Sequence, residues 1–306
     1  MSYMPGLPRV LTHLVASLTV TAVAAAQQGP RPVPFVSQPR NPRQGSLVTL
    51  RVTPPPAHGD SVVVVLGELA GEPLHFERRP GGGFGALAGI PLDAPDTVFL
   101  RLELHRATGV VDSAQVRVSV APRVSAVQRI ATAQRFIDAP DSVVTARIMA
   151  ERELTRGVAR GAHDVTRLWA QPFVRPRPRA SRVTTPFGAR RVVNGIASAR
   201  HAGLDMAGAA GATVRAANRG VVALVGDLFY GGISVYVYHG AGLMTAYYHL
   251  SRATVAVGDT VERGEVVGRV GATGRVTGPH LHWGAQYGRV SVDPVDLLAL
   301  LAASPD

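Results

Sequence analysis

Short runs of β-type residues, separated by clusters rich in glycine and proline, recur through most of this chain. The first set lies at Leu47–Val52, Ser61–Leu66, Thr97–Leu104 and Ala114–Val120. Strands at this spacing, with outward polar residues alternating along them, are typical of small β-sandwiches. The sequence therefore predicts a mainly β protein whose first domain is an Ig-like β-sandwich.

A second set of runs follows residue 180 and is richer in glycine, valine and tyrosine. Its members are Gly220–Val225, Gly232–His239, Thr245–His249, Val261–Val270 and Leu281–Tyr287. Between the two sets, Val143–Trp169 has the pattern of an amphipathic helix interrupted by Gly157 and Gly161, and an alternating Pro/Arg segment follows it. We expect a β-sandwich over residues 30–122, a helical and Pro/Arg-rich connector over 123–180, and an antiparallel sheet domain over 181–303.

The N-terminus has the features of an export signal. Arg9 precedes the apolar stretch Val10–Val23, and three alanines stand before Gln27 in the small-residue pattern of a cleavage site. We therefore expect residues 1–26 to be a signal peptide, with an uncleaved anchor as the alternative. The mature protein would be periplasmic or extracellular, without stable insertion in a membrane.

Composition excludes several classes of function. The chain has 306 residues, a net charge of +11 and no cysteine, so disulfide frameworks, cysteine–zinc sites and thiol nucleophiles are ruled out. All basic residues are arginine and most are scattered, and no signature of an RNA- or DNA-binding module accompanies them. We expect no nucleic-acid partner, whereas attraction to an anionic wall polymer fits the charge.

Two constellations in the C-terminal part could hold a metal ion. His201 and Asp205 are four residues apart and share one face of a strand or a helix, which supplies an imidazole and a carboxylate. His280 and His282 alternate with Leu281 and Trp283, so both imidazoles should face one side of a strand whose other side is apolar. Any metal site must be built from such groups because cysteine is absent.

Two further histidines end or interrupt alternating strands. His249 follows Tyr247 and Tyr248, and His239 follows Tyr238. A single histidine in such a position is more often structural than functional. We assign His239 a structural role. Residue spacing alone gives no reason to assign His249 a functional role either.

Together these segments resemble the lysostaphin/LytM-type zinc endopeptidases that cut peptidoglycan peptides. The resemblance runs from Thr185 to about Leu298, over some third of the chain, and the order and spacing of its motifs agree. The matching segments are Thr185–Gly188, His201–Asp205, Ala216–Val222, Tyr248–Ser251 and Gly271–Trp283.

The resemblance implies one zinc ion per chain, held by His201, Asp205 and His282. It assigns His249 and His280 to activation of the attacking water and stabilisation of the transition state, without deciding which is the general base. It implies an exported zinc metalloendopeptidase that hydrolyses peptide stems or cross-links of peptidoglycan through a zinc-activated water.

The sequence is also compatible with several alternatives. Some relatives have lost ligands and act as wall-binding proteins or as activators of a wall amidase, which is the second hypothesis for this chain. The family's oxyanion-stabilising tyrosine has no clear match between Gly188 and His201, so this donor is unassigned. A third hypothesis is that the N-terminal region or the connector occludes the cleft. The bond that is cut and the oligomeric state are not determined by the sequence.

Overall fold

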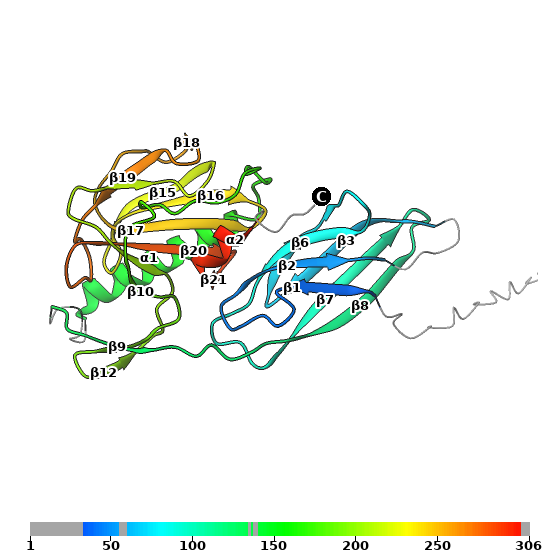
Figure 1. Cartoon of the computed structure of the whole chain (residues 1–306), viewed down its shortest axis with the longest axis horizontal. Coiled ribbons are helices and arrows are strands. Elements are labelled where there is room, and N and C mark those ends of the chain that lie inside the picture. Colours follow the sequence, from blue (N-terminus) through cyan, green and yellow to red (C-terminus); the bar gives the residue numbers. More distant parts are fainter. Residues whose placement is uncertain (1–32, 55–59, 134–135, 137–139, 301–306) are drawn as a thin grey trace, which may run out of the picture.

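The computed structural model describes residues 33–54, 60–133, 136 and 140–300. The expected signal peptide at residues 1–26 therefore lies outside the described residues. The fold is mainly β, as the sequence predicts, with an N-terminal β region and a C-terminal antiparallel sheet (Figure 1). No helix of the described part is long and apolar enough to span a membrane.

The N-terminal region consists of two four-stranded antiparallel sheets. One has the order β1-β2-β6-β5 and the other β4-β3-β7-β8. In β7 (Thr97–Arg106), Val98, Leu100, Leu102 and Leu104 point inward and the residues between them are more exposed, which is the alternation that identified this strand. The remaining strands are β1 (Phe35–Gln38), β2 (Leu47–Val52), β3 (Val62–Leu69), β4 (Glu72–His75), β5 (Glu77–Arg78), β6 (Phe84–Gly89) and β8 (Val111–Ser119).

A single long helix follows, and here one expectation is wrong. Helix α1 (Ser142–Gly161) runs through Gly157 without a break and stops at Gly161, well before Trp169. One glycine costs a helix about 1 kcal/mol, which capping by Asp141 and packing can offset. The Asp141 carboxylate accepts a hydrogen bond from the Val144 amide at 2.8 Å.

The C-terminal domain is built on a ten-stranded antiparallel sheet with the order β10-β13-β20-β17-β16-β15-β18. Strands β14 and β19 pair with each other, β19 also pairs with β17, and β21 pairs with β20. The bounds are β10 (Val183–Thr185), β13 (Leu204–Ala207), β14 (Thr213–Arg215), β15 (Gly220–Leu228), β16 (Gly232–Gly240), β17 (Leu243–Ala253), β18 (Thr260–Val261), β19 (Val266–Val270), β20 (His280–Tyr287) and β21 (Val290–Val292), with the short helix α2 (Pro294–Ala299) after them.

Two sequence expectations need correction in this domain. The run Val261–Val270 is not one strand, because a turn with Gly264 at φ +83° divides it into β18 and β19. The segment expected as a connector contains strand β9 (Val127–Ile130), which pairs in parallel with β11 (Arg190–Val193). With β12 (Ile196–Ser198) they form a small three-stranded sheet beside the main one.

The two β regions are joined by buried polar contacts. The Glu72 carboxylate of β4 is 4% exposed and binds His163 Nε2 at 3.0 Å and Arg289 Nε at 2.8 Å. The Asp296 carboxylate of α2 accepts a hydrogen bond from the Leu47 amide of β2 at 2.9 Å. A buried charge needs such partners, so these contacts fix how the sandwich meets the C-terminal domain.

Candidate metal centre

Three side chains from distant parts of the sequence converge at one end of the C-terminal sheet. His201 lies in the loop that leads into β13, Asp205 lies on β13, and His282 lies on β20. Strands β13 and β20 are antiparallel, and Asp205 is directly opposite His282 in their register. Two of the three groups are thus placed by ordinary sheet pairing.

The ligand-type atoms of this triad lie close together. Asp205 Oδ1 is 3.0 Å from His201 Nε2 and 2.7 Å from His282 Nδ1, and the two ring nitrogens are 2.8 Å apart. His201 Nδ1 lies 2.9 Å from the Pro186 carbonyl oxygen. A carbonyl oxygen only accepts, so Nδ1 carries the hydrogen and Nε2 of the neutral ring presents its lone pair to the other two groups.

This donor set fits a zinc ion. Two imidazole nitrogens and one carboxylate oxygen within 4.8 Å of one another match the three protein ligands of a catalytic zinc site. Fixing His201 through its other ring nitrogen is also the usual arrangement for a metal-binding histidine. The lone pairs of these three ligand atoms would face one another and repel. A cation bound between them would remove this repulsion.

The absence of a side chain at Gly203 leaves space for the His282 ring. A Cβ atom added at Gly203 would lie 2.5 Å from His282 Nε2 and 2.7 Å from the Trp283 carbonyl oxygen. Leu281 and Trp283 are fully buried on the other side of β20, as the alternation predicts. Packing on both sides therefore restricts the His282 ring.

The other two predicted histidines lie beside the triad. His280 Nε2 is 3.7 Å from Asp205 Oδ1, and the rings of His249 and His280 are 5.0 Å apart between centroids. His280 Nδ1 lies 2.9 Å from the Gly278 carbonyl oxygen, and His249 Nδ1 lies 2.9 Å from that of Thr273. Both rings therefore carry the hydrogen on Nδ1, which leaves Nε2 of each neutral ring as a proton acceptor.

His249 also has an unusual backbone. Its φ is +60°, in the left-handed region that residues other than glycine rarely adopt. Such conformations cost about 1–3 kcal/mol and cluster at functional sites. With this backbone conformation, the ring of His249 lies near those of His280 and His282, at centroid distances of 5.0 and 5.9 Å.

Burial and neighbouring charges set the protonation of the site. Burial works to raise the pKa of Asp205, but hydrogen bonds and charges from His201 and His282 outweigh it and hold the pKa well below its usual range. Burial lowers the pKa of His282 to about 4. Burial, with the charges of His282 and His280, lowers the pKa of His249 to about 3. At neutral pH the site thus has an ionised carboxylate and neutral rings at these two positions.

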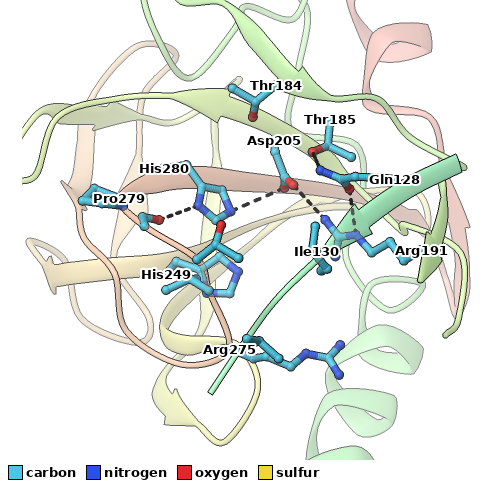
Figure 2. Close-up of a pocket in the computed structure, with 14 residues that line it drawn as sticks. Gln128, Ile130, Thr184, Thr185, Arg191, Asp205, His249, Arg275, Pro279 and His280 are labelled. Atoms are coloured by element: carbon cyan, nitrogen blue, oxygen red, sulfur yellow. Dashed lines mark hydrogen bonds and ion pairs between the residues drawn. The ribbon is translucent and has the colours of Figure 1, made fainter. Parts of the chain in front are cut away.

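An open cleft of about 270 Å³ borders Asp205, His249 and His280 (Figure 2). Its other walls come from segments that the sequence did not mark as functional. Gln128 of β9 donates to Thr185 Oγ1 at 2.8 Å, and Arg191 Nη2 of β11 donates to Asp205 Oδ2 at 2.8 Å. The parallel pairing of β9 with β11 brings Gln128 to this cleft, and no local pattern in the sequence signals that pairing.

His239 lies away from the triad and is fully buried. Its Nδ1 is 2.8 Å from the Arg219 carbonyl oxygen and its Nε2 is 2.8 Å from Thr245 Oγ1. Both ring nitrogens are satisfied by the fold. This agrees with the structural role expected for His239.

The C-terminal residues match a family of known peptidases. Residues 199–294 match the model of Peptidase family M23. Over 117 residues, or 38% of this chain, the sequence is 40% identical to the DD-carboxypeptidase/endopeptidase Mpg of Neisseria meningitidis. Over 119 residues it is 38% identical to the peptidoglycan DD-endopeptidase ShyC of Vibrio cholerae. Each match covers 27% of the relative, so the chain spans about a quarter of the length of these curated proteins.

A solved structure resembles most of the chain. It is a crystal structure from Pseudomonas aeruginosa assigned to peptidase M23, with a TM-score of 0.61 and 28% sequence identity. The similarity covers 84% of this chain and 95% of that one. The likeness therefore extends beyond the residues that match the family model and includes part of the N-terminal region.

Proposed function

We propose, from the premise that the C-terminal domain of this chain is a lysostaphin/LytM-type peptidase domain of family M23, that the protein is an exported zinc metalloendopeptidase acting on peptidoglycan. It would hydrolyse peptide stems or peptide cross-links of the cell wall. The observation that carries this proposal is the convergence of His201, Asp205 and His282 into one group, next to an open cleft that Asp205 and two further histidines border.

His201 Nε2, Asp205 Oδ1 and His282 Nδ1 would hold one zinc ion per chain. When bound, zinc supplies Lewis-acid polarisation of a peptide carbonyl and makes a water molecule more acidic. The chain's own contribution is to keep the three ligands in place. The register of β13 with β20 and the hydrogen bond from His201 Nδ1 to Pro186 do this.

His249 and His280 would move the protons of the reaction. Because the Nδ1 hydrogen of each ring is bound to a backbone carbonyl, each Nε2 accepts a proton first and can donate only afterwards. This order suits hydrolysis, in which the attacking water loses a proton and the departing amine gains one.

The proposed substrate implies a location outside the cytoplasm, and the signal-like residues 1–26 are consistent with that location. The net charge of +11 favours attraction to an anionic wall. Peptidoglycan is thus both the proposed substrate and the proposed partner.

The test is digestion of purified cross-linked peptidoglycan by the zinc-loaded chain, with fragments identified by mass spectrometry. We expect released cross-link fragments from the wild-type protein and none from the His201→Ala or Asp205→Ala variants. A protein that binds zinc, digests nothing and stimulates a wall amidase would instead support the activator hypothesis. Its His280→Ala variant would then keep that stimulation.

A further inference from the structure

The cleft beside the metal triad carries two arginine side chains. Arg191 comes from β11, and Arg275 comes from the loop between β19 and β20 (Figure 2). The lining residue with a negative charge is Asp205, which binds Arg191 and the histidines. Because the Asp205 carboxylate already has these partners, the two arginines give the cleft a net positive charge towards a bound ligand.

The backbone of Arg275 is held rigidly. Its amide donates to the Tyr230 carbonyl oxygen at 2.9 Å. The preceding residue, Gly274, has φ +73°, and a Cβ atom there would lie 2.4 Å from the Gly232 amide nitrogen. Thr273 Oγ1 adds a 2.7 Å hydrogen bond to the Leu250 carbonyl oxygen. The loop therefore fixes the position from which the arginine side chain starts.

The guanidinium of Arg275 is positioned but keeps its donors free. Its Cζ lies 4.7 Å from the centroid of the Tyr230 ring, a cation–π contact that uses the face of the group and leaves its N–H groups at the edge. Within the described residues it makes no hydrogen bond or ion pair through its side chain. A planar donor group held in this way is suited to binding a carboxylate through two parallel hydrogen bonds.

Arg191 is the second basic residue of the cleft. It lines the same cleft as Arg275, so both residues contribute positive charge there. Arg191 Nη2 binds Asp205 and its Nε lies 3.4 Å from Gln128 Oε1, whereas Nη1 donates no hydrogen bond to a described residue. Arg191 therefore retains a guanidinium N–H group that no described residue accepts a hydrogen bond from.

We propose that Arg275, assisted by Arg191, forms a carboxylate-binding subsite, and that the protein acts on stem peptides with a free carboxylate next to the scissile bond rather than on uncharged glycine bridges. This rests on the proposed function and specifies its substrate class. Arg275 acts as a specificity residue and takes no part in proton transfer.

The test compares two cross-linked muropeptide dimers that differ in one group. In one, the diamino acid at the cross-link has a free carboxylate, and in the other this carboxylate is amidated. We expect the zinc-loaded chain to cleave the free-carboxylate dimer with a kcat/KM at least about tenfold higher, the range of one charge-assisted hydrogen bond. Arg275→Gln should abolish this preference, and Arg275→Lys should keep part of it.

A matched control is Arg215→Gln, which removes an exposed arginine of β14 that does not line the cleft. It should leave the preference intact, which separates the subsite from general attraction to a basic protein. Equal cleavage of both dimers by the wild-type chain, or an undiminished preference in Arg275→Gln, would overturn the proposal.

A second readout does not depend on catalysis. Binding of both dimers to the chelator-treated full chain is measured by calorimetry, and the same preference and the same loss in Arg275→Gln are expected. If neither dimer is cleaved by any variant, the proposed hydrolysis fails, while this binding comparison still decides the subsite. Equal binding of both dimers would then overturn it.

Discussion

Asp205 Oδ1 lies 2.7 Å from His282 Nδ1 because the two residues occupy directly opposite positions on antiparallel strands β13 and β20. Two proposed metal ligands that are 77 residues apart in sequence are therefore placed by sheet register alone. A one-residue slip would turn one of the side chains to the other face of the sheet. The placement of Asp205 and His282 thus depends on the pairing of β13 with β20.

The first prediction concerns Gly203. A methyl group at this position would meet the His282 ring and the Trp283 carbonyl oxygen at 2.5 and 2.7 Å. Because Trp283 is fully buried and cannot move away, the ring must shift. We expect Gly203→Ala to weaken zinc binding about tenfold or more, the usual cost of disturbing the support of a ligand, as measured by competition with a chelating dye.

Gly226→Ala is the matched control for this change. Gly226 lies on β15, and an added Cβ would have its nearest neighbours at 3.9 and 4.0 Å, which is ordinary contact distance. Its zinc affinity should equal that of the wild-type chain. An unchanged affinity in Gly203→Ala would show that His282 does not hold the metal in the observed orientation.

The second prediction separates ligands from proton carriers. His249→Ala and His280→Ala should each retain about one zinc per chain, because neither ring belongs to the triad. Each should lower kcat about 100-fold or more, the usual contribution of a general acid or base. Zinc content and single-turnover cleavage of a muropeptide dimer are measured on the same samples. Loss of zinc from His280→Ala would make His280 a ligand instead.

The third prediction is a dependence of stability on pH that arises from His239. Burial lowers the pKa of His239 to about 4 in the folded chain, whereas an unfolded histidine titrates near about 6.5. Below pH ~6.5 the unfolded state binds the proton more readily, so the free energy of unfolding falls as the pH is lowered towards about 4, by at most ~1.4 kcal/mol per unit for this group.

Urea unfolding of the chelator-treated chain at several pH values measures this effect. The His239→Asn variant should be less stable at pH 7, because the bond to Thr245 is lost, but its stability should fall less steeply on acidification. Parallel curves for the two proteins would mean that His239 has the same proton affinity in both states.

The fourth prediction concerns β9 at the cleft. Some of the described residues that line the cleft precede the C-terminal domain, and these lie on β9 or just after it. If the region before the domain occludes the cleft, β9 is therefore the segment that would do so. The cleft remains open beside Asp205 with β9 in place. We therefore expect β9 to be a wall that supports the substrate. Gln128→Ala removes the hydrogen bond between β9 and Thr185, and it should lower kcat/KM on cross-linked peptidoglycan. A gain in activity would instead favour occlusion.

The parts that could be predicted from the sequence are those with a local signal. The alternation around His280–Trp283 predicts which side chains share a face, and the structure buries Leu281 and Trp283 accordingly. The strand runs of the sandwich and of the C-terminal sheet are likewise visible as alternation or apolar runs. The resemblance of the motifs then brought His201, Asp205, His249, His280 and His282 together, as the structure also does.

The parts that could not be predicted depend on contacts between distant segments. The parallel pairing of β9 with β11 leaves no periodic trace, so Gln128 and Arg191 were not expected at the cleft. The continuity of α1 through Gly157 depends on its cap and on packing against the sheet, which outweigh one glycine. The role of Arg275 depends on the Tyr230 ring beside it, which is 45 positions earlier in sequence.

The central claim is that one zinc ion is held by His201, Asp205 and His282. The most direct test is the zinc content of the dialysed full chain, measured by mass spectrometry for the wild type, for an alanine variant at each of the three positions, and for His105→Ala as a control in the sandwich. We expect about one zinc per chain in the wild type and the control and almost none in the three variants. Full zinc content in any of the three would contradict it.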